Sequence, residues 1–243
     1  MLAISGFSLS MCDVDYFMSR LARRLCQLGF PVLQLDPRGH GDSGGNLEDV
    51  TLSQLRGDLT EGLRFLRNRY GENVYIAGRG LSASISADLV YQGVAEGAVG
   101  VCPYCLQGSV VRDLWGELDR KSYTGIELVP GKEYRTLDDF DKRKVAFFGA
   151  LGARLRNLLG QKISSQFLRE LMEFDPLRAM VKSENKTCWL FYDDESENHI
   201  KRWEAAKQDS YIDLQEYALR PFLRDPIWMS DIMKAAGDWL LSR

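Results

Sequence analysis

The sequence predicts an α/β protein with a mostly parallel central sheet and helices on both of its faces. Short apolar runs alternate along the chain with amphipathic segments, as strands alternate with crossover helices. The chain has 243 residues, 45% of them hydrophobic, which is enough for one large domain with a substantial core. The alternation breaks at residues 106–178, and an insertion of that length predicts a lid subdomain. We therefore expect a core of residues 1–105 and 179–243 and a lid of residues 106–178.

The predicted elements follow this alternation along the chain. Strands are expected at short apolar runs bounded by turn residues, namely Leu2–Ser5, Pro31–Asp36, Asn73–Ala77, Ala98–Cys102, Thr187–Tyr192 and Tyr211–Tyr217. Helices are expected where apolar residues recur at helical spacing, namely Asp15–Leu28, Leu52–Arg69, Leu81–Gln92, Asn198–Lys207 and Ile227–Leu241. The last helix starts at Asp225-Pro226, an N-cap residue followed by a proline at the first helical position. Because the first strand begins at the first residue, we expect it at a sheet edge or beside an absent element.

The predicted lid holds three shorter fragments, which are strand-like or helical. They are Lys144–Phe148, Ala150–Leu159 and Ser165–Phe174. The amphipathic stretch Arg154–Leu159 is expected to pack on the core as a lid helix, with a partner or membrane-surface contact as the alternative.

Composition excludes several classes of function. A formal charge of −3 argues against nucleic acid or an anionic membrane as the main partner. No apolar run approaches the roughly 20 residues of a membrane span, and Met1–Phe17 lacks the features of a signal peptide. Five cysteines without a disulfide framework predict reduced thiols in the cytoplasm. The sequence predicts no cofactor and no metal, and it permits a homodimer.

A glycine-rich turn is the strongest local motif. Asp36-Pro37-Arg38-Gly39-His40-Gly41-Asp42-Ser43-Gly44 directly follows a predicted strand. Its glycines permit a tight turn, and open α/β sheets bind ligands at the carboxyl ends of their strands. Ordinary turn chemistry explains the same residues, so the motif alone leaves both interpretations open.

In its context, however, this motif resembles a known family. The Asp-x-Arg-Gly-x-Gly-x-Ser loop resembles that of alpha/beta-hydrolases of the serine peptidase, esterase and thioesterase type. The resemblance continues through Ile4–Phe7, Val74–Gly78, Val99–Pro103, Trp189–Tyr192 and Phe222–Leu240. It implies an alpha/beta-hydrolase fold with an inserted lid.

The resemblance also implies a nucleophile elbow, Gly-x-Ser-x-Gly, which is altered here. Gly78-Arg79-Gly80-Leu81-Ser82 puts Gly80 where the family has its serine. A glycine relieves the backbone strain that a catalytic serine bears there. A shifted alignment with Ser82 as the nucleophile needs two extra residues between strand and turn.

The other triad members are only partly matched. The family's acid follows the fifth predicted strand, where Asp193 and Asp194 are available. The family's histidine precedes the final helix, where the counterparts Arg220 and Pro221 cannot act as general bases near neutral pH. Loss of nucleophile and base together indicates a degenerate triad, because triad members act as a unit.

Three further residues have two interpretations each. His199 either approaches Ser82 as a base or is a partly exposed histidine at a helix start, and His40 is either a site residue or a structural one. Cys102-Pro103-Tyr104-Cys105 matches the C-x-x-C redox pattern, but it ends a predicted strand instead of opening a helix. Cys102 is thus expected to line the crevice or to be a small buried hydrophobe.

The leading hypothesis is a hydrolase-like protein without triad chemistry. It binds a small acyl, peptide or metabolite ligand, or serves as an accessory protein in biosynthesis. By the family's geometry, the backbone N–H groups of Phe7 and Leu81 form the former oxyanion hole, and Gly80, His40 and Cys102 line the crevice.

Two alternatives remain. One is an active ester, thioester or peptide hydrolase that uses Ser82, Asp193 or Asp194, and His199. The other is isomerase or epimerase chemistry, with a base from residues 193–197 or His199.

Overall fold

The computed structural model describes residues 1–13, 16–116, 118, 123–124, 130–135, 139–153, 162–178, 186–191, 213–216 and 226–243. Within them a six-stranded sheet has the order β2-β1-β3-β4-β7-β8, and every pair is parallel. The strands are β1 (Leu2–Ile4), β2 (Leu33–Gln34), β3 (Tyr75–Arg79), β4 (Gly97–Val101), β7 (Thr187–Phe191) and β8 (Asp213–Glu216). The predicted class is confirmed.

The placement of β1 corrects the prediction for the first strand. β1 pairs with β2 on one side and β3 on the other, so it is neither an edge strand nor short of a neighbour. The edge strands of the described sheet are β2 and β8, and helix α1 (Phe17–Gln27) connects β1 to β2. The third predicted strand also shifts: β3 extends to Arg79, which pairs with Val101 of β4.

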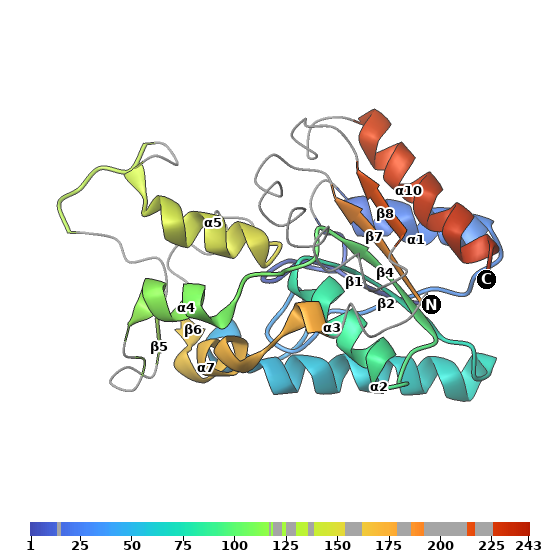
Figure 1. The fold of residues 1–243 in the computed structure, drawn as a ribbon, viewed down its shortest axis with the longest axis horizontal. Helices are drawn as coiled ribbons and strands as arrows, with labels where there is room; N and C mark the ends of the chain where they lie inside the picture. The colour runs from blue at the N-terminus through green and yellow to red at the C-terminus, as the bar shows by residue number, and fades with distance from the viewer. Residues whose placement is uncertain are drawn as a thin grey trace.

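Helices cover both faces of the sheet. Figure 1 shows α1 and α10 (Pro226–Leu241) on one side and α2 (Leu52–Tyr70) and α3 (Leu81–Tyr91) on the other. Each pair closes its own apolar core. One core includes Phe17 and Trp239, and the other includes Leu59 and Ile85. No described helix is both long and apolar enough to cross a membrane.

The segment between β4 and β7, here called the insertion, packs against the α2 and α3 side. It contains α4 (Gly108–Trp115), β5 (Tyr123–Thr124), α5 (Lys142–Ala150), β6 (Ile163–Ser164) and α7 (Ser165–Glu173). Outside the insertion, a short 3-10 helix, η2 (Leu47–Asp49), precedes α2. Phe147 and Phe167 of the insertion belong to the same buried cluster as Leu59. The division into core and lid at residues 106–178 stays a prediction.

Helix α5 corrects the boundaries predicted inside the insertion. Lys144–Phe148 lies within α5, which begins after Asp141 because that carboxylate accepts the N–H groups of Arg143 and Lys144. The predicted helices Arg154–Leu159 and Asn198–Lys207 fall outside the described residues.

Candidate functional site

The turn between β3 and α3 is built around Gly80. Gly80 is the N-cap of α3, with φ 60° and ψ −126°, a conformation that costs an L side chain free energy. Its N–H donates to the carbonyl of Val101 over 3.0 Å, which fixes the turn to β4. A Cβ on Gly80 would lie 2.4 Å from the carbonyl oxygen of Leu151. The residue at the elbow is therefore a glycine with no space for a side chain.

Ser82 lies beyond the turn, in the first turn of α3. Its hydroxyl donates to the carbonyl of Ser5 over 2.8 Å. A Cβ on Gly78 would lie 2.6 Å from the carbonyl carbon of Ser82, so strand and helix are in close contact. The Ser82 hydroxyl thus serves strand–helix packing in this arrangement.

The backbone N–H groups of Phe7 and Leu81 converge on one oxygen. That oxygen is the carbonyl of Leu151, at 3.2 Å from the nitrogen of Phe7 and 3.1 Å from that of Leu81. The two N–H groups that the family resemblance assigns to an oxyanion hole therefore hold a carbonyl of the insertion. Sequence reasoning did not foresee this occupant.

The Leu151 carbonyl is available because of how α5 ends. Gly152 adopts φ +83° and donates to the carbonyl of Gly149, while Ala153 donates to that of Phe148. This is a Schellman ending, in which the C-cap carbonyl of Leu151 has no partner within the helix. The aligned peptide dipoles also make this end of α5 partly negative. Two N–H donors are a favourable environment for such a group.

Arg79 binds the next carbonyl along the chain. Its Nη2 donates to the carbonyl of Gly152 over 2.6 Å, and it also binds the carboxylate of Asp13 over 2.7 Å. The side chain of Arg79 is 7% exposed and that of Asp13 is 0% exposed. The ion pair is therefore buried, and it anchors the end of α5.

We call the two backbone stretches Gly6–Phe7 and Arg79–Leu81 the cradle, since they enclose the end of α5 together. A Cβ on Gly6 would lie 2.2 Å from the carbonyl oxygen of Gly152. A Cβ on Gly152 would lie 3.0 Å from the Cα of Gly6 and 3.2 Å from that of Gly80. Three chain segments meet here only because all three positions are glycine.

His40 packs behind the cradle. It is buried, its Nδ1 lies 2.9 Å from the carbonyl of Arg38, and its ring meets Phe7 edge-on at 5.4 Å between centroids. Burial lowers the pKa of His40 below its ordinary value, although that hydrogen bond and the charges of Asp36 and Asp58 oppose the shift. His40 therefore supports Phe7 as a neutral ring.

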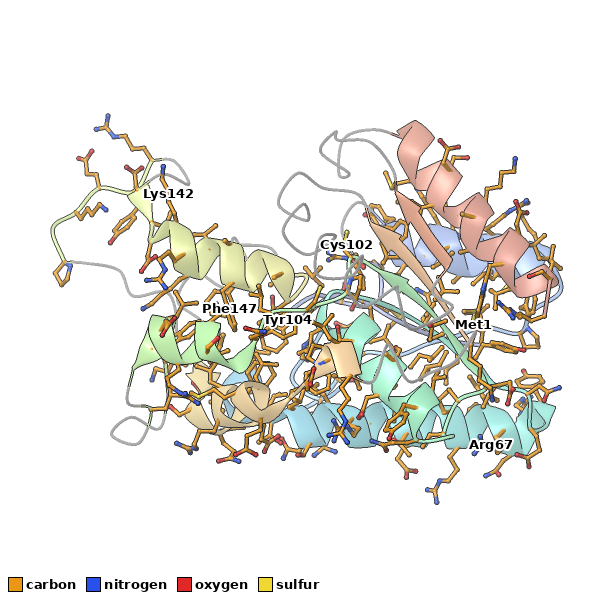
Figure 2. All side chains as sticks on the ribbon, viewed as in Figure 1. Met1, Arg67, Cys102, Tyr104, Lys142 and Phe147 are labelled. Carbon is orange, nitrogen blue, oxygen red and sulfur yellow. The ribbon has the colours of Figure 1, made fainter. Side chains whose placement is uncertain are left out.

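The C-x-x-C motif continues the end of β4. Cys102 is half-buried with φ 44°, and Cys105 is buried with its Sγ 3.1 Å from the carbonyl of Pro103. Between them, Tyr104 contacts Phe147 of α5 edge-on, with ring centroids 6.2 Å apart, and Figure 2 labels both residues. This contact packs α5 against the segment that follows β4, in addition to the contacts of its C-terminal end with the cradle.

Several predicted site residues fall outside the described residues. They are Asp193, Asp194, His199, Arg220 and Pro221. Their roles stay predictions. Within the described part of the chain, no group of three His, Cys, Asp or Glu side chains is arranged to hold a metal ion.

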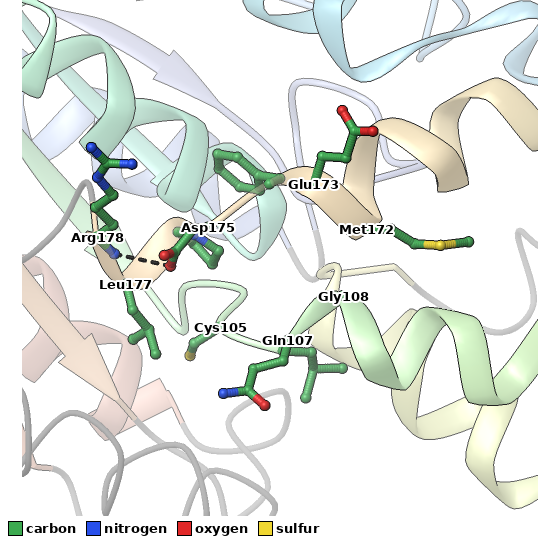
Figure 3. Close-up of a pocket in the computed structure, with 11 residues that line it drawn as sticks. Cys105, Gln107, Gly108, Met172, Glu173, Asp175, Leu177 and Arg178 are labelled. Atoms are coloured by element: carbon green, nitrogen blue, oxygen red, sulfur yellow. Dashed lines mark hydrogen bonds between the residues drawn. The ribbon is translucent and has the colours of Figure 1, made fainter.

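A cavity of about 500 Å³ lies within the insertion, between its first residues, 105–108, and residues 172–178. Figure 3 shows Cys105 and Gln107 on one side of it and Asp175 and Arg178 on another. The backbone N–H of Arg178 donates to the Asp175 carboxylate over 3.1 Å. No cradle residue lines this cavity, so the two features are separate.

Four residues of the cradle region were not identified as site residues from the sequence: Asp13, Arg79, Leu151 and Gly152. A charged residue at the end of a buried strand needs a partner, and that rule singles out Arg79. A glycine after an apolar helical pattern marks a helix end, and that rule singles out Gly152. Nothing in the sequence joins the two positions.

The chain resembles solved structures, although no protein-family model and no curated protein matches it. Est1E from Butyrivibrio proteoclasticus, described with bound ferulic acid, aligns with a TM-score of 0.67 at 14% identity, over 99% of this chain and 88% of its own. A monoacylglycerol lipase from Paleococcus ferrophilus aligns at 0.61 and 19% identity, over 99% and 93%. Mouse alpha/beta hydrolase domain-containing protein 10 aligns at 0.65 and 12% identity, over 99% and 89%. Similarity at these identities shows a shared fold.

Proposed function

We propose that this protein, whose chain has the alpha/beta-hydrolase fold, carries out no acyl transfer and acts by binding a small acyl, peptide or metabolite ligand. In this role it would serve as an accessory protein in a biosynthetic pathway. The cradle carries the proposal, because Gly80 stands at the elbow and the Leu151 carbonyl receives both oxyanion-hole donors.

Acyl transfer by this fold depends on a nucleophile that forms a covalent intermediate. Glycine has no side chain to supply one. The transition state also depends on N–H donors that are ready for a developing oxyanion, and here those of Phe7 and Leu81 are already engaged. Both requirements fail at the same place.

The described geometry does not favour the two alternatives. Hydrolysis through Ser82 would have to begin by breaking its hydrogen bond to the Ser5 carbonyl. Isomerase chemistry needs a base beside the substrate, and the ionisable groups described at the cradle, Arg79 and Asp13, form an ion pair. Non-covalent binding makes neither demand.

Space for a ligand supports the binding role. The cavity of about 500 Å³ within the insertion has the size of known small-molecule sites, roughly 300–1,000 Å³. Its lining is mixed, with Leu106 and Phe174 beside Asp175 and Arg178. Such a lining suits an amphipathic ligand such as an acyl chain with a polar end.

The proposal is tested with a fluorophosphonate probe and with p-nitrophenyl esters of short and long acyl chains. We expect no covalent label and no ester hydrolysis above the buffer rate. Ser82→Ala is the matched control and should change neither result. Labelling of Ser82 that is lost in Ser82→Ala would overturn the proposal and establish the hydrolase alternative.

A further inference from the structure

We infer that the cradle is a receptor for a neutral peptide main chain of the form apolar residue–glycine, and that Leu151-Gly152 is its internal ligand. The inference rests on the proposed function, because the cradle donors serve a non-covalent ligand only if they do not serve acyl transfer. It goes further by naming the chemistry that the cradle selects.

The donors of the cradle match consecutive peptide carbonyls. Two N–H groups bind the carbonyl of Leu151, at 3.1 and 3.2 Å, and one guanidinium nitrogen of Arg79 binds the carbonyl of Gly152 at 2.6 Å. Consecutive carbonyls in fixed register are the repeating feature of a peptide main chain. A simple ester or a lone acyl group supplies only the first of them.

Steric crowding selects glycine at the second position. Gly152 has φ +83°, and any Cβ there would press on the Cα atoms of Gly6 and Gly80 at 3.0 and 3.2 Å. A residue with a side chain would meet both backbone strain and close contacts. The second residue of a ligand is therefore glycine.

Burial selects an apolar side chain at the first position. Leu151 is 0% exposed and belongs to one apolar cluster with Phe7, Leu81, Phe147 and Phe148. A polar side chain in that place would lose its hydration without gaining a described partner. The first residue of a ligand is therefore apolar.

The described ion pair of Arg79 with Asp13 favours a neutral amide over a carboxylate. Asp13 already offsets the charge of Arg79, and its side chain is fully buried. A ligand carboxylate on Arg79 would bring a second negative charge beside a buried one, which costs free energy. The ligand is thus a peptide that continues beyond the glycine or ends in an amide, not a free C-terminal glycine.

Competition by the internal segment sets the design of the experiment. A tethered ligand acts at an effective concentration of the order of millimolar or higher. A free peptide can bind only those molecules in which Leu151-Gly152 has left the cradle, so its apparent affinity is reduced in proportion to their fraction. The full-length protein therefore needs a substitution that weakens the internal ligand and leaves the cradle intact. Gly152→Ala does this, because Gly152 belongs to the ligand side.

The experiment measures binding of a fluorescent peptide with the sequence of residues 147–152, acetylated and amidated. We expect Gly152→Ala to bind it about tenfold more tightly than the unchanged protein does. Gly131→Ala is the matched control, since Gly131 has φ +80° in open space within the insertion, and it should bind like the unchanged protein. In Gly152→Ala, peptides that end in alanine amide or in a free glycine carboxylate should bind at least about tenfold more weakly than the glycine amide.

Leu151→Ala is a second variant that weakens the internal ligand, and it replaces Gly152→Ala if that protein does not fold. Absence of saturable binding in the folded variant, or equal binding of the three peptides, would overturn the inference. The proposed function fails separately, through fluorophosphonate labelling of Ser82. A protein that is neither labelled nor bound by peptide retains the proposed function and loses only this inference.

Discussion

Two glycine-rich turns follow the carboxyl ends of strands β2 and β3, and different contacts hold each turn in place. The turn after β2, from Asp36 to Gly44, is closed by its own residues: Asp42 donates to the Asp36 carboxylate and Gly39 to the Gly44 carbonyl. The elbow turn around Gly80 is closed by the end of α5, more than seventy positions away in the sequence. The first turn is local chemistry, whereas the second depends on the insertion.

Under the proposed function, this difference explains how a hydrolase fold keeps the elbow turn without a nucleophile. A catalytic elbow holds a strained side chain beside an open crevice. Here the side chain is absent, and main chain from Leu151-Gly152 takes the space. The same hydrogen-bond donors then stabilise the fold where they would otherwise serve a reaction.

The largest expected effect comes from the buried ion pair beside the elbow turn, Arg79–Asp13. Arg79→Met leaves Asp13 buried without its described cation, which should lower the free energy of unfolding by about 3–5 kcal/mol. Arg38→Met is the matched control, because Arg38 pairs with Asp58 at the first turn with its side chain 48% exposed. That change should cost at most about 1 kcal/mol. Urea unfolding of both variants measures the difference, and equal losses would contradict the contrast between the turns.

A smaller effect is expected from a side chain at the elbow. Gly80→Ser forces a Cβ against Leu151, whereas Gly116→Ser places one in open space at nearly the same backbone angles, φ 60° and ψ −133°. Gly116→Ser should cost about 1–3 kcal/mol for backbone strain alone. Gly80→Ser should cost about 1–3 kcal/mol more because of overpacking. If urea unfolding gave the two variants the same stability, the end of α5 would not fill the elbow in solution.

The sequence predicts the local features of both turns and misses the contact between distant segments. Six parallel strands follow from apolar runs, and Gly80 at the elbow follows from the resemblance of residues 78–82 to the Gly-x-Ser-x-Gly motif. The start of α5 was missed because Lys144–Phe148 is too short an apolar run to separate strand from helix. The filling of the cradle was missed because it joins Leu151 to Phe7 and Leu81 through main-chain atoms, which have no sequence signature.

The smallest expected effect is a pH dependence at the first turn. Burial lowers the pKa of His40 below 6.5, so the unfolded chain binds a proton there that the folded protein does not. Stability should therefore fall as the pH drops below about 6.5, and His40→Gln should flatten that slope between pH 6.5 and 5.5. Asp58 and Glu170 also have lowered pKa values, but their contributions are lost only as the pH falls below their ordinary values of 3.8 and 4.5. An unchanged slope in His40→Gln would contradict the account of this turn.

The central claim is that the end of α5 occupies the cradle, and amide hydrogen exchange at Phe7 and Leu81 tests it most directly. Leu81 opens α3, where an N–H has no partner within its own helix, so its protection requires the Leu151 carbonyl. Both amides should exchange slowly in the unchanged protein. Gly152→Ala should accelerate both together by about tenfold, and Gly131→Ala should accelerate neither. Fast exchange in the unchanged protein, or exchange that Gly152→Ala does not alter, would contradict the claim.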